Sequence, residues 1–294
     1  MWDLALFIAS SFGLAALVDA WFLSVLGSTE NALLLSLLGQ AWGLLRMYTP
    51  TVGALLALKA LGRSLAGELR SYLGSLRRAL ACFLLAPLLA YFAVGVYVVL
   101  GFALGLVDLG KPVRVVAEQL ARQAGLRIPE ESVRLLLLAQ LLLAYAAAIT
   151  INALFALGEE LGWRGYMYRR LGSQSDLRST LVIGAVWGLW HATAIGLLGH
   201  NYPVLRWAGV PLFAIFCVLL TALMLPLVER SGSVLPAVSL HGAVNALWSF
   251  TVLVTQVEGA AGEALGGLGV LGLASLAATW LLLRPVLPKL ARAA

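Results

Sequence analysis

The sequence predicts an all-α polytopic membrane protein, a single membrane domain over residues 1–294 with about eight transmembrane helices around a polar intramembrane cavity. Hydrophobic residues make up 61% of the 294 residues, charged residues make up only 12%, and the mean hydropathy is +0.94. Soluble domains are about 45–50% apolar and about 25% charged. A soluble globular protein, a disordered chain and a disulfide scaffold are therefore excluded.

The first two spans are predicted from long apolar stretches near the N-terminus. The chain is apolar from its start to about Leu26 and has no basic n-region, so we expect a retained first helix rather than a cleaved signal. Residues 32–61 form the second stretch. It contains Arg46 and Pro50, and we expect it to be bent.

Two polar segments separate the spans that follow. Residues 63–78 are basic with leucines at helical spacing, which indicates an amphipathic segment at the membrane interface. Residues 108–134 are the most polar stretch and predict an extramembrane loop with short helical turns. Six further apolar stretches predict the remaining spans. They are residues 79–107, 135–157, 181–198, 209–228, 234–254 and 265–283.

Basic residues are distributed unevenly between the two sides of the predicted bundle. If the loops alternate, the side that carries both termini has twelve Lys and Arg residues and the other side has six. The positive-inside rule then puts both termini in the cytoplasm, and the net charge of +6 reflects topology rather than a nucleic-acid partner. The twelve residues are Arg63, Arg70, Arg77, Arg78, Arg164, Arg169, Arg170, Arg178, Arg230, Arg284, Lys289 and Arg292.

Polar side chains inside the spans need a specific reason, because a charge near the bilayer centre costs about 2.5–3.5 kcal/mol on insertion scales. Asp19 and Arg46 lie in consecutive helices at matching depth, which favours a structural ion pair over a catalytic role. Asn152 shares a helical face with Glu159 and is expected to hydrogen-bond to another helix. His200 lies in a short loop and is expected to be solvated.

Two adjacent acids end the fourth predicted span. The side chains of Glu159 and Glu160 point roughly 100° apart on a helix, so they cannot share one task. Arg164 follows Glu160 by four residues and can neutralise it along one helical face. Glu159 is then free to face the bundle interior. The alternative is a charge cluster at the interface with no chemical role.

Two later spans each carry a histidine. His191 follows Trp187 by four residues, and His241 precedes Asn245 by four, so each pair shares a helical face. Structural hydrogen bonds between helices are the alternative for both. Together with Glu159, these residues supply a base for water, a group that orients water or protonates a leaving amine, and donors for a tetrahedral oxyanion. The chain has neither a G-x-S-x-G nor an HExxH motif.

These three clusters resemble the motifs of the CAAX-protease and bacteriocin-processing-enzyme family, also called the Abi or type II CAAX endopeptidase family. EExxxR matches residues 159–164, FxxxH matches residues 187–191, and HxxxN matches residues 241–245. Trp187 replaces the phenylalanine of the second motif, and this change is expected to leave the chemistry unaltered. The motif-bearing catalytic core extends over about residues 135–254.

The resemblance implies an intramembrane endopeptidase that cleaves near the C-terminus of a membrane-anchored or prenylated (CAAX-type) substrate. Its cavity would open towards the cytosol and the lipid. The residues matching Glu159 and His191 would activate a water, and those matching His241 and Asn245 would hold the oxyanion. The supporting residues would be Glu160, Arg164 and Trp187.

The need for a metal stays open at this point. Glu159, His191 and His241 could form a site for a divalent metal such as zinc. Asn245 beside His241 suits oxyanion binding better than zinc ligation, which favours a reaction that requires no cofactor. A transporter that uses the polar cluster as a proton or ion path is a further alternative, as is a non-catalytic scaffold or immunity protein.

Overall fold

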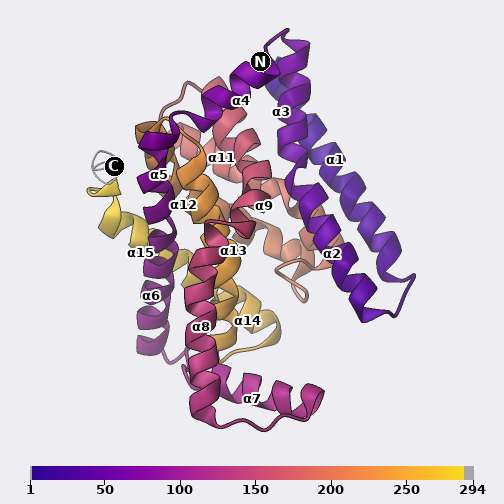
Figure 1. Cartoon of the computed structure of the whole chain (residues 1–294), viewed down its shortest axis with the longest axis vertical. Helices are drawn as coiled ribbons and strands as arrows, with labels where there is room; N and C mark the ends of the chain where they lie inside the picture. Colours follow the sequence, from indigo (N-terminus) through magenta and orange to yellow (C-terminus); the bar gives the residue numbers. More distant parts are fainter. Residues whose placement is uncertain (1, 288–294) are drawn as a thin grey trace.

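The computed structural model describes residues 2–287, and helices dominate it (Figure 1). Within that range the only β-type contact is one isolated antiparallel bridge between Val107 and Thr255, so the all-α prediction is confirmed. Lys289, Arg292 and the side chain of Arg78, which enter the topology count, lie outside the described part of the chain.

Seven helical segments in the described range are long and apolar enough to cross a membrane, and the chain is an integral multi-pass membrane protein. The second predicted span, residues 32–61, is the one of the eight that is not among them, because it is divided into two shorter helices. The seven are Trp2–Leu26, Ala79–Ala103, Glu130–Ala148, Leu177–Leu198, Arg206–Ser231, Leu235–Val254 and Gly259–Leu283.

The divided span confirms the predicted bend. After α1 (Trp2–Leu26), α2 (Ala32–Met47) ends at Tyr48 and α3 (Thr49–Ala60) begins directly afterwards. Pro50 lies in the first turn of α3, where its missing N–H would have no partner within the helix in any case. α1 packs along both halves, so these three helices form one hairpin at the side of the bundle (Figure 1).

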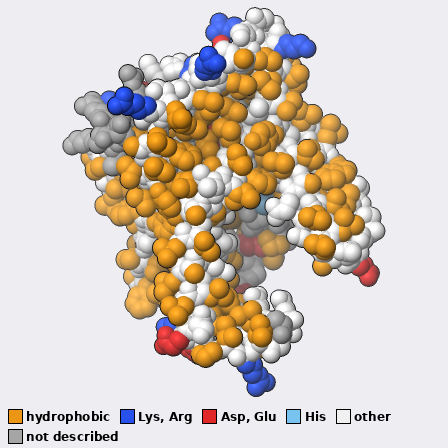
Figure 2. All heavy atoms as spheres, viewed as in Figure 1, with side chains coloured by type: hydrophobic (Ala, Val, Ile, Leu, Met, Phe, Trp, Pro, Cys, Tyr) orange, Lys and Arg blue, Asp and Glu red, His pale blue; other side chains and the backbone are white. Residues whose placement is uncertain are grey.

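The basic segment before the third span is amphipathic, as predicted. α4 (Leu65–Leu73) packs Leu65 and Leu69 against the core and leaves its charged residues outside. α5 (Leu76–Leu85) and α6 (Pro87–Ala103) then continue into the membrane. Lys and Arg side chains gather at the end of the molecule that carries α4, and apolar side chains cover the flank below (Figure 2).

The segment of residues 108–134, predicted as an extramembrane loop with short helical turns, is more regular than predicted. The segment forms α7 (Lys111–Ala124), a helix that lies across the end of the molecule opposite α4, and α8 (Glu130–Ala148) already begins within it (Figure 1). Val113, buried on α7, shows why the segment folds as a helix. Its apolar residues recur at helical spacing, and this periodicity outweighs the polar composition.

The fourth predicted span is also two helices, because the chain breaks between α8 and α9 (Ile151–Glu160). At the break, the hydroxyl of Thr150 donates to the carbonyl oxygen of Ala146 at 2.6 Å, and such a bond competes with the regular helical ladder. The predicted contact of Asn152 is confirmed, since its amide donates to the carbonyl oxygen of Gly242 at 3.1 Å.

Glu159 and Glu160 are the last two residues of α9, as the sequence predicted. The chain does not leave the helical path there, because α9 runs without interruption into a π-helix, Leu161–Met167, and then into α10 (Tyr168–Arg170). All seven residues of the π-helix are buried. The extra residue that a π-turn inserts keeps the segment helical while it shifts the side chains, and such turns occur frequently at functional sites.

α13 (Leu235–Val254) is the centre of the bundle and packs against α5, α6, α8, α9 and α12 (Val210–Ser231). α11 (Leu177–Trp190) packs closely on α12, because a side chain at Gly184 or Gly188 would overlap the α12 backbone. A short π-helix, Ala194–Leu198, and a 3-10 turn, Arg206–Gly209, connect these two helices. α14 (Gly259–Leu265) and α15 (Val270–Leu283) complete the described chain.

Candidate active site

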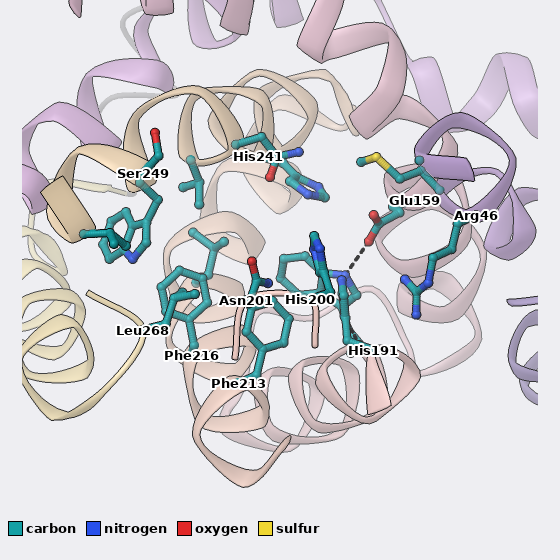
Figure 3. A pocket seen from close by; sticks show the side chains of 18 of the residues that line it. Arg46, Glu159, His191, His200, Asn201, Phe213, Phe216, His241, Ser249 and Leu268 are labelled. Atoms are coloured by element: carbon teal, nitrogen blue, oxygen red, sulfur yellow. Dashed lines mark hydrogen bonds between the residues drawn. The ribbon is translucent and has the colours of Figure 1, made fainter. Parts of the chain in front are cut away.

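A cavity of about 460 Å³ lies between α2, α9, α11, α12 and α13, and all four predicted catalytic residues line it. Glu159, His191 and His241 come together at its polar part, although they belong to three different helices (Figure 3). The rest of the wall is largely aromatic and aliphatic. Its apolar residues include Phe213, Phe216, Leu220, Trp248, Val252 and Leu268.

Glu159 lies in the wall of the cavity with 2% of its surface exposed. Its Oε2 atom accepts a hydrogen bond from the indole N–H of Trp187 at 2.5 Å. Among the residues that the structure describes, no side chain or backbone group donates to Oε1. One oxygen is thus held in place and the other is available to a ligand or a water. The alternative interpretation, in which Glu159 belongs to a charge cluster at the membrane interface, is contradicted by this burial.

His191 follows the last residue of α11 and is also buried. Its Nδ1 atom lies 2.9 Å from the carbonyl oxygen of Trp187. Because a carbonyl can only accept, Nδ1 carries the hydrogen, and Nε2 of the neutral ring is an acceptor. The rings of Trp190 and Phe213 contact the imidazole edge to face, with centroid distances of 4.7 and 4.6 Å. These contacts fix the orientation of the ring.

Trp187 contacts every part of the polar cluster. Besides its bonds with Glu159 and His191, its ring lies 4.2 Å from the guanidinium carbon of Arg164 and 5.2 Å from the ring of His241. A phenylalanine could keep the ring contacts but could not donate to Glu159. The replacement therefore adds a hydrogen bond from the indole N–H to the acid, and the expectation that it leaves the chemistry unaltered stays a prediction.

Glu160 lies behind the cavity wall and joins two of the predicted residues. Its Oε1 atom accepts from Arg164 at 3.1 Å, which confirms the predicted pair, and from Nδ1 of His241 at 2.9 Å. Arg164 also donates to the hydroxyl of Thr221 on α12 at 2.6 Å. Glu160 and Arg164 are both fully buried, so the pair is part of the interior of the bundle.

The bond to Glu160 decides which nitrogen of His241 is available. Since Nδ1 donates to the carboxylate, Nε2 is the nitrogen left for the cavity. Asn245 lies one turn further along α13 and is exposed on the cavity wall. The spacing of four residues therefore brings both side chains to one cavity, as the sequence predicted.

The predicted ion pair between Asp19 and Arg46 is confirmed, with 2.9 Å between Oδ1 and Nε. Arg46 also lines the cavity, a role that the sequence did not indicate (Figure 3). The sequence feature that could have indicated this role is a positive charge in an apolar helix. The ion pair with Asp19 is enough to explain that charge, so the feature does not predict a place in the cavity. His200, expected to be only solvated, likewise lines the cavity together with Asn201. Apart from their polar character, these two loop residues carry no sequence signal.

The cavity extends away from the basic end of the molecule. Its lining residues on α13 run from His241 to Val252, near the end of that helix, and Leu268 precedes α15. No lining residue belongs to the loops around α4, α10 or the α12–α13 turn. The described surface is hollowed on the side of α7 and α14, with a histidine visible at the hollow (Figure 2).

The expectation put both termini and the opening of the cavity on the cytoplasmic side. α1 begins at the basic end of the molecule (Figure 1), whereas the residues that line the cavity lie away from the basic loops. The orientation of the termini and of the cavity in the membrane stays a prediction.

The polar cluster does not fit a metal ion in this arrangement. Over residues 2–287, no group of three or more His, Cys, Asp or Glu side chains is placed to hold one. We therefore derive no step through a metal.

The comparison with known families agrees with the motifs. Residues 135–247 match the family model described as Type II CAAX prenyl endopeptidase Rce1-like. The matched range contains all three motifs and ends two residues after Asn245. No curated protein and no solved structure matches the chain significantly. The family resemblance predicted from the motifs is thus confirmed over this range.

Proposed function

We propose that this chain, whose residues 135–247 match the Rce1-like type II CAAX prenyl endopeptidase family model, is an intramembrane endopeptidase that acts near the C-terminus of a membrane-anchored or prenylated substrate. The observation that supports this proposal best is that Glu159, His191, His241 and Asn245, from three separate helices, line one cavity. An apolar bundle has no packing reason to bring four polar groups together, because each of them is costly in the membrane.

The geometry supports hydrolysis by an activated water. A water between Oε1 of Glu159 and Nε2 of His191 would lose a proton to the carboxylate as its oxygen bonds to the carbonyl carbon of the substrate. The tetrahedral oxyanion would accept hydrogen bonds from the amide of Asn245 and from Nε2 of protonated His241. The C–N bond then breaks, and the proton held by Glu159 passes to the leaving amine.

Glu160 and Arg164 support this reaction without contacting the substrate. Glu160 holds His241 through Nδ1, and Arg164 holds Glu160. Without this arrangement, Nε2 of His241 would not be directed at the oxyanion. We therefore assign both residues a positioning role.

The apolar part of the cavity supports a lipid-like substrate. Phe213, Phe216 and Trp248 present aromatic surface beside the polar cluster. An isoprenoid or other aliphatic group could bury its methylene groups there, at about 0.8 kcal/mol for each CH₂. A soluble peptide without such a group would gain little from this wall.

We further propose that the basic loops and both termini face the cytoplasm and that the cavity opens to the other side and the lipid. The experiment is labelling of Ser249→Cys, at the mouth of the cavity, with a membrane-impermeant thiol reagent on intact cells. Both native cysteines are buried. We expect labelling from outside for Ser249→Cys and only after permeabilisation for Arg70→Cys. The reverse pattern would overturn the orientation.

The function itself is tested with the purified chain in detergent and a labelled prenyl-peptide, with and without a strong chelator. We expect cleavage near the peptide C-terminus at a rate that the chelator leaves unchanged. Loss of cleavage that added zinc restores would replace the water mechanism with a metal-dependent one. Absence of cleavage, together with proton or ion flux in liposomes, would favour a transporter instead.

A further inference from the structure

Arg46 is the only lysine or arginine among the described residues that line the cavity. It is 3% exposed and comes from α2, outside the range that the family match covers. Its guanidinium lies beside Glu159 in the polar part of the cavity (Figure 3). Arg46 nevertheless forms no ion pair with Glu159, because its one carboxylate partner within the described residues is Asp19.

The guanidinium is held at two of its three nitrogens. Nε donates to both oxygens of Asp19, at 2.9 and 3.2 Å, and Nη2 donates to the carbonyl oxygen of Trp190 at 2.8 Å. The guanidinium carbon lies 3.8 Å from the centre of the Trp190 ring. No group in the described part of the chain accepts from Nη1. A rigid positive group with one unused donor nitrogen therefore faces the cavity.

Asp19 is held as firmly as Arg46. It accepts from the indole N–H of Trp42 at 2.8 Å and from the hydroxyl of Thr193 at 2.6 Å, in addition to Arg46. A buried pair needs good geometry and further hydrogen bonds to offset its desolvation, and this pair has both. Such a network can hold the guanidinium at the surface of the cavity. Without it, the side chain would turn away towards water.

We propose that Arg46 binds the free C-terminal carboxylate of the peptide substrate through Nη1. This inference rests on the proposed function and adds the chemical class of the end group that the site selects. A peptide cut near its C-terminus must bring a carboxylate into a largely apolar cavity, where an unpaired charge is costly. A charge-assisted bond to a guanidinium offsets that cost.

The proposal also explains why the cation belongs to α2. The break between α2 and α3 at Tyr48 is bonded to α9. The hydroxyl of Tyr48 donates to the carbonyl oxygen of Leu154 at 2.8 Å, and the hydroxyl of Thr51 donates to the carbonyl oxygen of Gly158 at 2.6 Å. They hold Arg46 at a constant distance from Glu159. A fixed distance between a carboxylate-binding group and the base that activates water defines how far from the C-terminus the bond is cut.

The experiment compares two prenyl-peptides that differ only in their last group, a carboxylate or a carboxamide. The wild-type chain is expected to cleave the acid with about 10–100-fold higher kcat/KM than the amide, the range that a hydrogen bond to a charged group supplies. In the double variant Asp19→Asn/Arg46→Gln this preference should fall to within about 2-fold, mainly through KM. Cleavage of the amide should fall less than cleavage of the acid.

The double variant removes both charges at once, so that no unpaired charge stays buried. The control is Arg63→Gln, which removes an exposed partner of Glu68 and should keep the preference for the acid. Equal cleavage of acid and amide by the wild type would overturn the proposal, as would an unchanged preference in the double variant. An equal loss on both peptides would show that Arg46 only supports the fold or Glu159.

A second measurement needs no variant. The short peptide released by cleavage should inhibit the wild-type chain at least about 10-fold more strongly as the acid than as the amide. Equal inhibition would contradict the proposal even if the double variant does not fold. If the wild type cleaves neither peptide, the proposed function itself fails, and that result differs from cleavage without a preference.

Discussion

Glu159→Gln is expected to lower the rate of peptide cleavage by about 10²–10⁴-fold, the range that a positioned general base contributes. Glutamine has nearly the same shape and can still accept from the indole N–H of Trp187, so the fold should be retained. It cannot take a proton from water. The measurement is kcat/KM of the purified variant on a labelled prenyl-peptide, with thermal unfolding in the same detergent as a test of folding.

His191→Ala should cause a loss of similar size, since the same water depends on Nε2 of that ring. The matched control is Glu118→Gln, which changes the same chemical group on the exposed face of α7 and should leave the rate unaltered. Near wild-type activity of Glu159→Gln or His191→Ala would refute the assigned mechanism. Such a result would not affect the match of residues 135–247 to the family model, which depends on the sequence alone.

Arg164→Met is expected to have the largest effect on stability, a loss of about 3–5 kcal/mol in the free energy of unfolding. The variant leaves the carboxylate of Glu160 buried without its cation, and it removes a donor to Thr221. It should also abolish cleavage, because Glu160 would no longer be held against His241. The measurement is the unfolding transition in detergent, followed by intrinsic tryptophan fluorescence.

The chain offers a matched control for this prediction. Glu118 and Arg122 on α7 have the same spacing of four residues and the same 3.1 Å distance between N and O, but both are exposed. Arg122→Met should cost no more than about 1 kcal/mol, because water screens that pair. The double variant Glu160→Gln/Arg164→Met should recover part of the lost stability. An Arg164→Met variant as stable as Arg122→Met would show that burial does not control the effect.

Much of the site could be predicted from the sequence because its signals are local. Residues four apart on a helix share a face, so spacing alone predicts that Glu160 pairs with Arg164 and that His241 and Asn245 face the same side. The bend at Pro50 follows from the missing N–H of proline. These inferences depend on neighbours along one helix, and the structure places all of these residues as the spacing predicts.

The predictions are incomplete where local pattern and tertiary packing disagree. Polar residues follow an apolar run at Glu159 and Glu160, and this pattern is typical of a helix end. α9 does end at Glu160, but a π-helix continues it and both acids are buried. The polar composition of α7 is typical of a loop, although its periodicity is that of a helix. Composition is a weak guide wherever one face of a helix packs against its neighbours.

By itself, the sequence determined that the chain is a helical membrane protein and which polar residues form the proposed site, since both follow from composition and from spacing within single helices. Only the tertiary structure decided how those residues are connected. It joined Glu160 to His241, turned the indole of Trp187 to Glu159, and brought Arg46 from α2 into the cavity. The physical reason is that these contacts join helices far apart in the chain, and their register depends on how neighbouring helices pack.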